Sequence, residues 1–257
     1  MIEDSVAKPL TSDLRYFRIC ITAMAVIAVL GFVVNVVLGR SSFDAPLVVH
    51  VHAVVFMGWV AIFVTQAWLA AAGAKGLHRL LGIVAVVWAV AVVIMGPLVT
   101  IEAVRGERVA FFFYPQHFLL SNPASMLGFL GLFTAAVLLR RHHDWHPRLQ
   151  MGSFMLIMGA GIGRLLPMPF LTPYAYEIAA AAPLTFALFS MVRDQRVHGR
   201  VHPAWWWPIG VTVVILIATR LVAFSPLGDA IYAAATEGSI AAGTDGRAFP
   251  APPPGAP

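Results

Sequence analysis

Histidines at both ends of a long apolar run are the residues of this chain best suited to chemistry. The run extends over residues 46–73, with His50 and His52 near its start, and His78 and Arg79 follow its end. About 20 apolar residues span a bilayer, so this run predicts a transmembrane helix. A histidine inside such a helix is costly and marks a functional site or a buried partner. Because neutral imidazoles bind haem iron and other transition metals, His50, His52 and His78 are candidate ligands.

One face of the same helix carries a stripe of polar and aromatic side chains. His52, Trp59 and Gln66 recur at seven-residue steps, and Phe56 and Phe63 fall on the same face. His50 lies about 200° around the helix from His52, so the two cannot face one ligand. The stripe predicts either a site in which Trp59 and Gln66 contact a substrate, or aromatic packing with a histidine bonded to a neighbouring helix.

Four ionisable residues in different apolar runs are expected at a similar depth, roughly 5–10 Å below one interface. They are His52, Arg164, Glu177 and Arg220. One interpretation is a shared cavity in which the arginines face a haem propionate, a quinone oxygen or a carboxylate substrate. The other is a structural Arg–Glu pair, with the second arginine extended towards the interface.

The remaining histidines gather in the loops of the opposite end, except for His117, which lies in an aromatic segment. His78 and His146 are candidate haem or metal ligands there; loops next to acidic lipid are also often rich in histidine. The His78-Arg79 and His146-Pro147-Arg148 sequences each precede a helix, which is a weak internal echo. Gly159 and Gly163 have the spacing that lets membrane helices approach closely.

The elements that position these residues are membrane helices. The chain of 257 residues is 60% hydrophobic and 11% charged, with a mean hydropathy of +0.82, whereas soluble domains are about half apolar and a quarter charged. We predict an all-α bundle of seven transmembrane helices, at about residues 17–39, 46–72, 80–103, 124–140, 150–169, 174–192 and 206–226. Residues 104–123 are expected to form an interfacial or re-entrant loop. Residues 227–257 are expected to form an external tail, with a short helix over 227–240 and a disordered Pro-rich end.

The distribution of basic residues predicts the orientation. Eleven lysines and arginines flank one side of the predicted helices and four flank the other, so the amino terminus should be cytoplasmic and the carboxyl terminus external. The net charge of +5 therefore predicts contact with lipid and no nucleic-acid partner. Cys20 is the only cysteine, which excludes an internal disulfide, a CxxCH haem attachment and an iron–sulfur cluster held by this chain alone.

Residues 46–165 resemble a family of predicted bacterial inner-membrane proteins that carry a domain of unknown function. The resemblance rests on Gln66, His78-Arg79, Gly82, the segment 140–151 and Arg164. The four-helix part is also loosely similar to cytochrome b561-type proteins, which hold two b haems between histidine pairs on different helices. This similarity implies haem b in the bacterial cytoplasmic membrane. The chain departs from that pattern because the one partner for His50 or His52 in the outer leaflet is His117, in a predicted loop.

Three function classes remain open from the sequence. The first is a b-type haem protein, an oxidoreductase if it is an enzyme, that exchanges electrons with quinone or a periplasmic partner. The second is a transporter or permeability protein for a small molecule or ion that uses the Arg/Glu/His cavity. The third is a structural or sensory subunit of a membrane complex. Oligomeric state and substrate are not predicted.

Overall fold

The computed structural model describes residues 4–41 and 44–252, with side chains from Ser12 onwards. The described part is helical and contains no β-strand. Its α-helices are α1 (Asp4–Val37), α2 (Leu47–Ala71), α3 (Lys75–Arg105), α4 (Pro115–Leu138), α5 (Trp145–Gly163), α6 (Ala175–Ala181), α7 (Leu184–His198), α8 (Trp206–Ala223) and α9 (Pro226–Thr236). Two 3₁₀ turns, η1 (Met168–Leu171) and η2 (Pro203–Trp205), lie between them.

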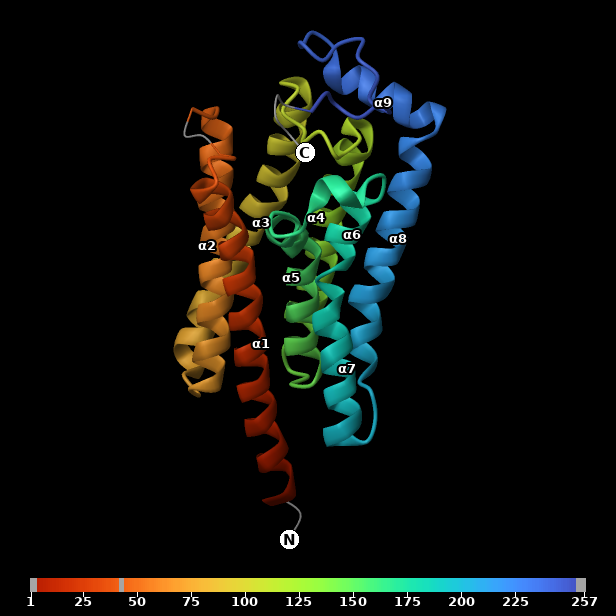
Figure 1. Cartoon of the computed structure of the whole chain (residues 1–257). Coiled ribbons are helices and arrows are strands. Elements are labelled where there is room, and N and C mark those ends of the chain that lie inside the picture. The colour runs from red at the N-terminus through yellow and green to blue at the C-terminus, as the bar shows by residue number, and fades with distance from the viewer. Residues whose placement is uncertain (1–3, 42–43, 253–257) are drawn as a thin grey trace.

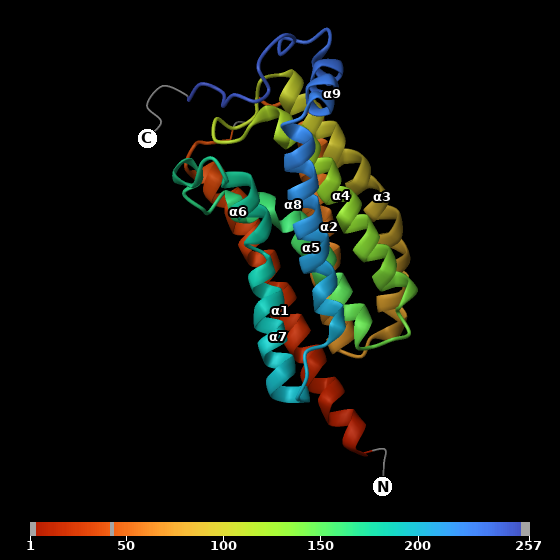
Figure 2. The same cartoon turned by 90° about the vertical axis from the view of Figure 1, so that its right-hand side faces the viewer.

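The long helices run side by side and form an elongated bundle (Figures 1 and 2). The start of α1 and the loops 72–74, 139–144 and 199–202 lie at one end, which we call the amino-terminal end. The segments 106–114 and 164–174 and helix α9 lie at the opposite, carboxyl-terminal end. The chain therefore starts and finishes its helical part at opposite ends of the bundle.

Six stretches of the described chain have the length and apolarity of a membrane span. They are Ser12–Val37, Leu47–Ala71, Lys75–Arg105, Pro115–Leu138, Ala175–His198 and Pro203–Ala223. The predicted all-α membrane fold is therefore confirmed, with six such stretches. Large apolar side chains such as Ile83, Val87 and Val214 are exposed on the outside of the bundle, where lipid would cover them.

Helix α5 was also expected to be a membrane span, but it is less apolar than the six stretches above. It contacts α1, α4, α6 and α8, and its buried residues include Arg148 and Ser153 as well as Phe154 and Met155. A helix enclosed by other helices does not face lipid, so it can carry polar residues that a lipid-facing helix cannot.

Several boundaries differ from the prediction: α1 and α3 begin earlier, at Asp4 and Lys75, and the predicted helix 174–192 is divided into α6 and α7. Two further differences concern α4 and α5. The expected loop over residues 104–123 is wrong in its second half, because α4 begins at Pro115 and contains Pro123. A proline at the first helical position loses no hydrogen bond, and membrane helices accommodate internal prolines. Helix α5 begins earlier than predicted, at Trp145, where the Asp144 carboxylate accepts a bond from the Trp145 backbone N–H.

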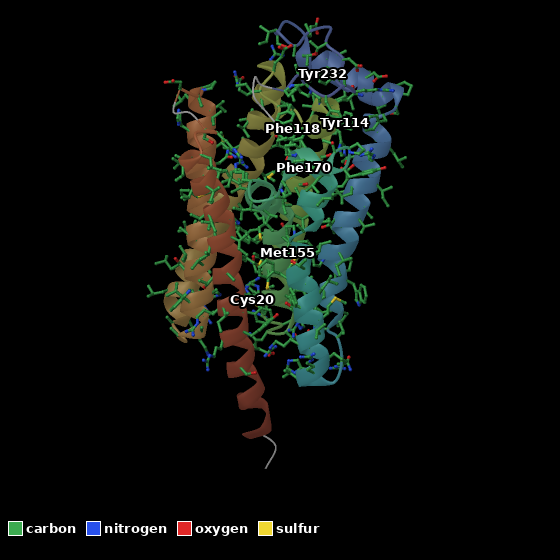
Figure 3. The ribbon with its side chains drawn as sticks, viewed as in Figure 1. Cys20, Tyr114, Phe118, Met155, Phe170 and Tyr232 are labelled. Carbon is green, nitrogen blue, oxygen red and sulfur yellow. The ribbon has the colours of Figure 1, made fainter. Side chains whose placement is uncertain are left out.

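The segment after α9 folds back over the start of α4. The backbone N–H of Gln116 donates to the Gly246 carbonyl (3.0 Å), and the ring of Tyr114 stacks on Phe249 at 3.9 Å. Asp229 accepts two bonds from Arg247, at 2.7 and 2.5 Å. Figure 3 shows Tyr114 and Tyr232 at this end of the bundle. The predicted short helix is thus α9; the last residues of the Pro-rich tail, 253–257, lie outside the described residues.

Sulfur and aromatic side chains fill the middle of the bundle. Met24, Phe129, Phe154, Met155 and Met158 are each at most 1% exposed, and Met155 lies midway along the bundle in Figure 3. We call these five residues the apolar layer.

Glycines allow the backbones of α1 and α6 to pack closely against α5. Gly161 packs on Ala28 of α1, opposite Gly31, while Gly159 and Gly163 pack on Ala179 of α6. The packing role predicted for Gly159 and Gly163 is confirmed.

Candidate functional site

A buried polar group lies near the carboxyl-terminal end, between α4, α6 and α8. His117, Ser121 and Ser125 recur every four residues on one face of α4, and His117 is 2% exposed. Ser121 Oγ donates to Thr219 Oγ1 of α8 (3.0 Å), and His117 Nε2 lies 3.4 Å from the same oxygen. We call this set, together with Tyr176, Glu177 and Arg220, the His117 cluster.

The charged part of the His117 cluster is an ion pair between α6 and α8. Arg220 Nη1 contacts Glu177 Oε1, and the guanidinium lies over the rings of Tyr174 (4.8 Å) and Phe224 (5.3 Å). Glu177 Oε2 is buried without a hydrogen-bond partner among the described residues. An unsatisfied carboxylate oxygen is costly, so this atom is suited to accept a proton or a donor group.

Tyr176 connects the ion pair to the polar face of α4. Its ring lies 5.2 Å from the ring of His117, and its hydroxyl donates to Asn122 Oδ1 at 3.4 Å. Proton-carrying groups of α4, α6 and α8 therefore lie close to the Glu177–Arg220 pair.

The four residues predicted to share one cavity are divided between two groups. The Arg–Glu pairing predicted as one interpretation is confirmed for Arg220 and Glu177. Arg164 instead lies over the ring of Phe32 of α1 (4.2 Å) and donates to the Ala160 carbonyl. His52 interacts electrostatically with Arg164 and stacks against Phe56, with ring centroids 4.1 Å apart. Arg164 and His52 thus belong to the side formed by α1, α2 and α5.

The stripe on α2 serves mainly as packing. Trp59 is 2% exposed, and its ring meets Phe129 and Phe133 edge-on at 5.1 and 5.2 Å. Gln66 Nε2 donates to the His78 carbonyl at 3.1 Å. The predicted substrate contacts of Trp59 and Gln66 stay predictions. His50 is half-buried on another face of α2.

His78 and His146 lie together at the amino-terminal end. Their ring centroids are 6.3 Å apart, with planes at 85°. His78 Nδ1 lies 3.3 Å from the Gln66 carbonyl, and His146 Nδ1 lies 2.7 Å from the Ala136 carbonyl. Each histidine therefore links the start of one helix to the preceding helix. The two similar sequence motifs thus make the same kind of contact. The carbonyl contacts favour a proton on Nδ1 and leave Nε2 as the free nitrogen.

A second polar site is a cavity of about 300 Å³ at the amino-terminal end. It is lined by Asp13, Asp144, Arg148, Asp194, His198, Arg200 and His202, and we call it the Arg148 pocket. Arg148 Nε and Nη2 donate to the two oxygens of Asp194, at 3.0 and 2.8 Å. Trp205 Nε1 donates to Asp194 Oδ2 at 2.9 Å. Arg148 and Asp194 are 3% and 2% exposed, so the pocket has a buried ion pair in its wall.

Histidine–aspartate contacts form the rim of the Arg148 pocket. His198 Nε2 lies 3.2 Å from Asp13, and His202 Nε2 lies 3.1 Å from Asp144. Partial burial lowers the pKa of His202, although Asp144 acts in the opposite direction. Burial also tends to raise the pKa of Asp144, but the bonds from His202 and from the backbone together outweigh it, and the pKa is lowered. The seven lining residues therefore carry a net charge of −1 when both histidines are neutral and of +1 when both are protonated.

Sequence reasoning missed the acidic half of this pocket. Asp144 and Asp194 lie near helix ends and Asp13 precedes the first predicted span, where charged residues are normally solvated, and the sequence gives Arg148 no role in a polar site. Within the described ranges, no group of three or more His, Cys, Asp or Glu side chains is placed to hold a metal ion. Comparisons with protein families, curated proteins and solved structures found no match to this chain. The function is therefore argued from the geometry of the two sites.

Proposed function

We propose that this chain is a multi-pass membrane transporter that moves a small anion together with a proton. The observation that supports it is the placement of ionisable groups near both ends of the bundle, on either side of the apolar layer. Ionisable residues inside a membrane are rare and mark substrate or proton pathways by default. The excess of basic residues at the amino-terminal end favours a cytoplasmic position for that end in a bacterial inner membrane.

The Glu177–Arg220 pair supplies the coupling step. With Glu177 ionised, its carboxylate neutralises Arg220. A proton that binds Glu177, with Oε2 as the free atom, removes this negative charge and leaves the Arg220 guanidinium for an anion. One proton and one monovalent anion would then bind together, so the loaded site carries the same net charge as the empty one.

The apolar layer gives the transporter its barrier. Ser125 is ten residues into α4, about 15 Å from its start, and Phe129 of the apolar layer follows one turn later. The Arg148 pocket lies beyond the layer. Protons and anions cannot cross packed Met and Phe side chains, so transport requires a second conformation that opens the layer towards the Arg148 pocket.

Proton uptake by proteoliposomes tests this proposal. Vesicles that contain a trapped pH dye would receive an inward gradient of chloride, lactate or phosphate. We expect wild-type protein to acidify the lumen with at least one anion, and E177Q and R220Q to abolish this flux. The matched control is E102Q/R108Q, which removes an exposed ion pair near the same end and should transport normally. Wild-type rates equal to those of protein-free vesicles with all three anions would overturn the proposal.

A second candidate function is b-type haem binding, which the His78–His146 geometry favours. Imidazoles are common protein ligands of haem iron, and the centroids of these two rings lie 6.3 Å apart. His78 and His146 would hold the haem through Nε2, with Nδ1 bonded to the carbonyls of Gln66 and Ala136. His50, His52 and His117 do not form a second pair. A bound haem would supply one-electron transfer with a quinone or periplasmic partner.

The absorption spectrum of the purified protein tests the haem candidate. A reduced-minus-oxidised band in the visible α region that disappears in H146A would support it. The control is H142A, which changes an exposed histidine of the same end and should keep the band. A colourless wild-type protein would remove this candidate.

A further inference from the structure

A groove on the outside of α7 lies beside the Arg148 pocket and faces the space where lipid would be. It has a volume of about 330 Å³ and is lined by Met191, Val192, Gln195, Arg196 and Val201. Its wall is almost entirely apolar, and Val192 is 49% exposed. A groove of this composition buries apolar chains.

The local backbone explains why the groove exists. Gly199 ends α7 with a φ of 71°, in the left-handed region that glycine adopts readily. Gln195 Nε2 donates to the Gly199 carbonyl at 3.1 Å. The chain then turns back towards Pro203, where η2 begins, so Val201 lines the groove together with Met191 of α7.

Two arginines place positive charge at and beside the groove. Arg196 lines the groove and Arg200 lines the adjoining pocket. The nearest acid in sequence, Asp194, is taken by Arg148 and Trp205. Neither Arg196 nor Arg200 forms an ion pair with a residue that the structure describes.

We propose that this groove binds one anionic phospholipid. An acyl chain lies along Met191, Val192 and Val201, and the headgroup phosphate lies between Arg196 and Arg200. Basic pockets beside membrane helices bind anionic headgroups in this way. Trp206 and Trp207, 60% and 58% exposed next to this loop, place it at the headgroup level of the bilayer. The proposal does not rest on the transport function.

Lipid titration followed by native mass spectrometry tests the site. The purified protein in detergent would be mixed with dioleoylphosphatidylglycerol or dioleoylphosphatidylcholine, which share acyl chains and differ in headgroup charge. We expect one tightly retained phosphatidylglycerol, and roughly 30-fold weaker retention in R196Q/R200Q. Glycerol phosphate at the same concentration should not compete, because it lacks the chains.

Two further variants separate a site from general attraction. R140Q/R141Q removes the same charge from the same end but away from the groove, and should retain the lipid normally. V192W fills the groove and should weaken the retention of the lipid without changing the charge. Equal retention of the two lipids by wild type would overturn the proposal. So would equal losses in the two arginine double variants, or undiminished binding in V192W.

Discussion

The guanidinium of Arg148 and the carboxylate of Asp194 form a two-point ion pair between α5 and α7, away from solvent. Its two N–O distances are 3.0 and 2.8 Å, and the indole of Trp205 donates to the same carboxylate. The Arg148 guanidinium also lies 5.4 Å from the ring of Phe17 of α1. The pair therefore joins α1, α5, α7 and η2 at the amino-terminal end.

Breaking this pair on one side should destabilise the fold strongly. R148M leaves Asp194 charged and buried, which we expect to lower the free energy of unfolding by about 3–5 kcal/mol. The measurement is equilibrium unfolding in mixed detergent–SDS micelles. R108Q, which breaks the exposed Arg108–Glu102 pair, should cost at most about 1 kcal/mol. The double variant R148M/D194L should recover most of the loss, and similar losses in R148M and R108Q would contradict this prediction.

The fold should lose stability as the pH falls below about 6.5. His202 Nδ1 accepts from the Ala204 N–H and its Nε2 faces Asp144, so the neutral ring fits the site. Its pKa is lowered by burial, so the folded chain binds fewer protons than the unfolded chain near pH 6. The lowered pKa of Asp144 adds a further loss below about pH 4.

Thermal midpoints at pH 7.5, 6.5 and 5.5 measure this dependence. H202Q should show a smaller decrease over this range than wild type, because it removes one proton-binding group. H142Q changes an exposed histidine and should behave like wild type. An unchanged slope in H202Q would show that His202 does not contribute.

Helix α1 should dock on α5 only if position 31 has no side chain. A Cβ at Gly31 would overlap the carbonyl oxygen of Gly161, and backbone atoms there cannot move aside. G31A should therefore lower the thermal midpoint and expose Cys20 on α1 to thiol reagents. The control is G131A, at an exposed helical position with nothing within 4 Å, which should be neutral or stabilise by about 0.5–1 kcal/mol. A normal thermal midpoint in G31A would mean that α1 and α5 are further apart than described.

The segment 237–252 should depend on the bond between Arg247 and Asp229. The bonds from Gln116 and Arg247 lower the pKa of the Asp229 carboxyl, so the contact persists in mildly acidic solution. R247Q should make the segment more sensitive to limited proteolysis, while R40Q, at another exposed position of the same end, should not. Identical digestion of R247Q and wild type would show that the stacking of Tyr114 on Phe249 suffices to hold the segment.

The sequence predicts the helices better than it predicts the sites. Apolar runs identify α1, α2 and α8 because lipid-facing helices must be apolar on most faces. The prediction from the sequence misplaces the start of α4, because Pro115 and Pro123 suggest a loop but are tolerated in the helix. It treats α5 as one more lipid-facing span, since the sequence does not show that other helices enclose it.

The sequence also predicts some site residues and misses others, for a similar reason. Glu177 and Arg220 are conspicuous because they interrupt apolar runs, and their pairing could be predicted. Asp13 and Asp194 belong to helices far apart in sequence, and only the packing of α1 against α7 brings them to one pocket. His117 was expected in a loop, so its position on the face shared with Ser121 could not be recognised.

The close contact of Gly31 with Gly161 has a consequence for biogenesis. The ribosome must extend the chain from residue 31 to residue 161 before this contact can form, which takes roughly 7–26 s at about 5–20 residues per second. During that time the glycine surface of α1 remains in contact with lipid. Helix α5 is too polar to be stable there alone, so its insertion depends on helices made before it. The first helix of the chain thus provides a surface on which the fifth packs when it inserts. Mutations at Gly31 should therefore trap nascent chains at the insertion machinery as well as destabilise the finished bundle.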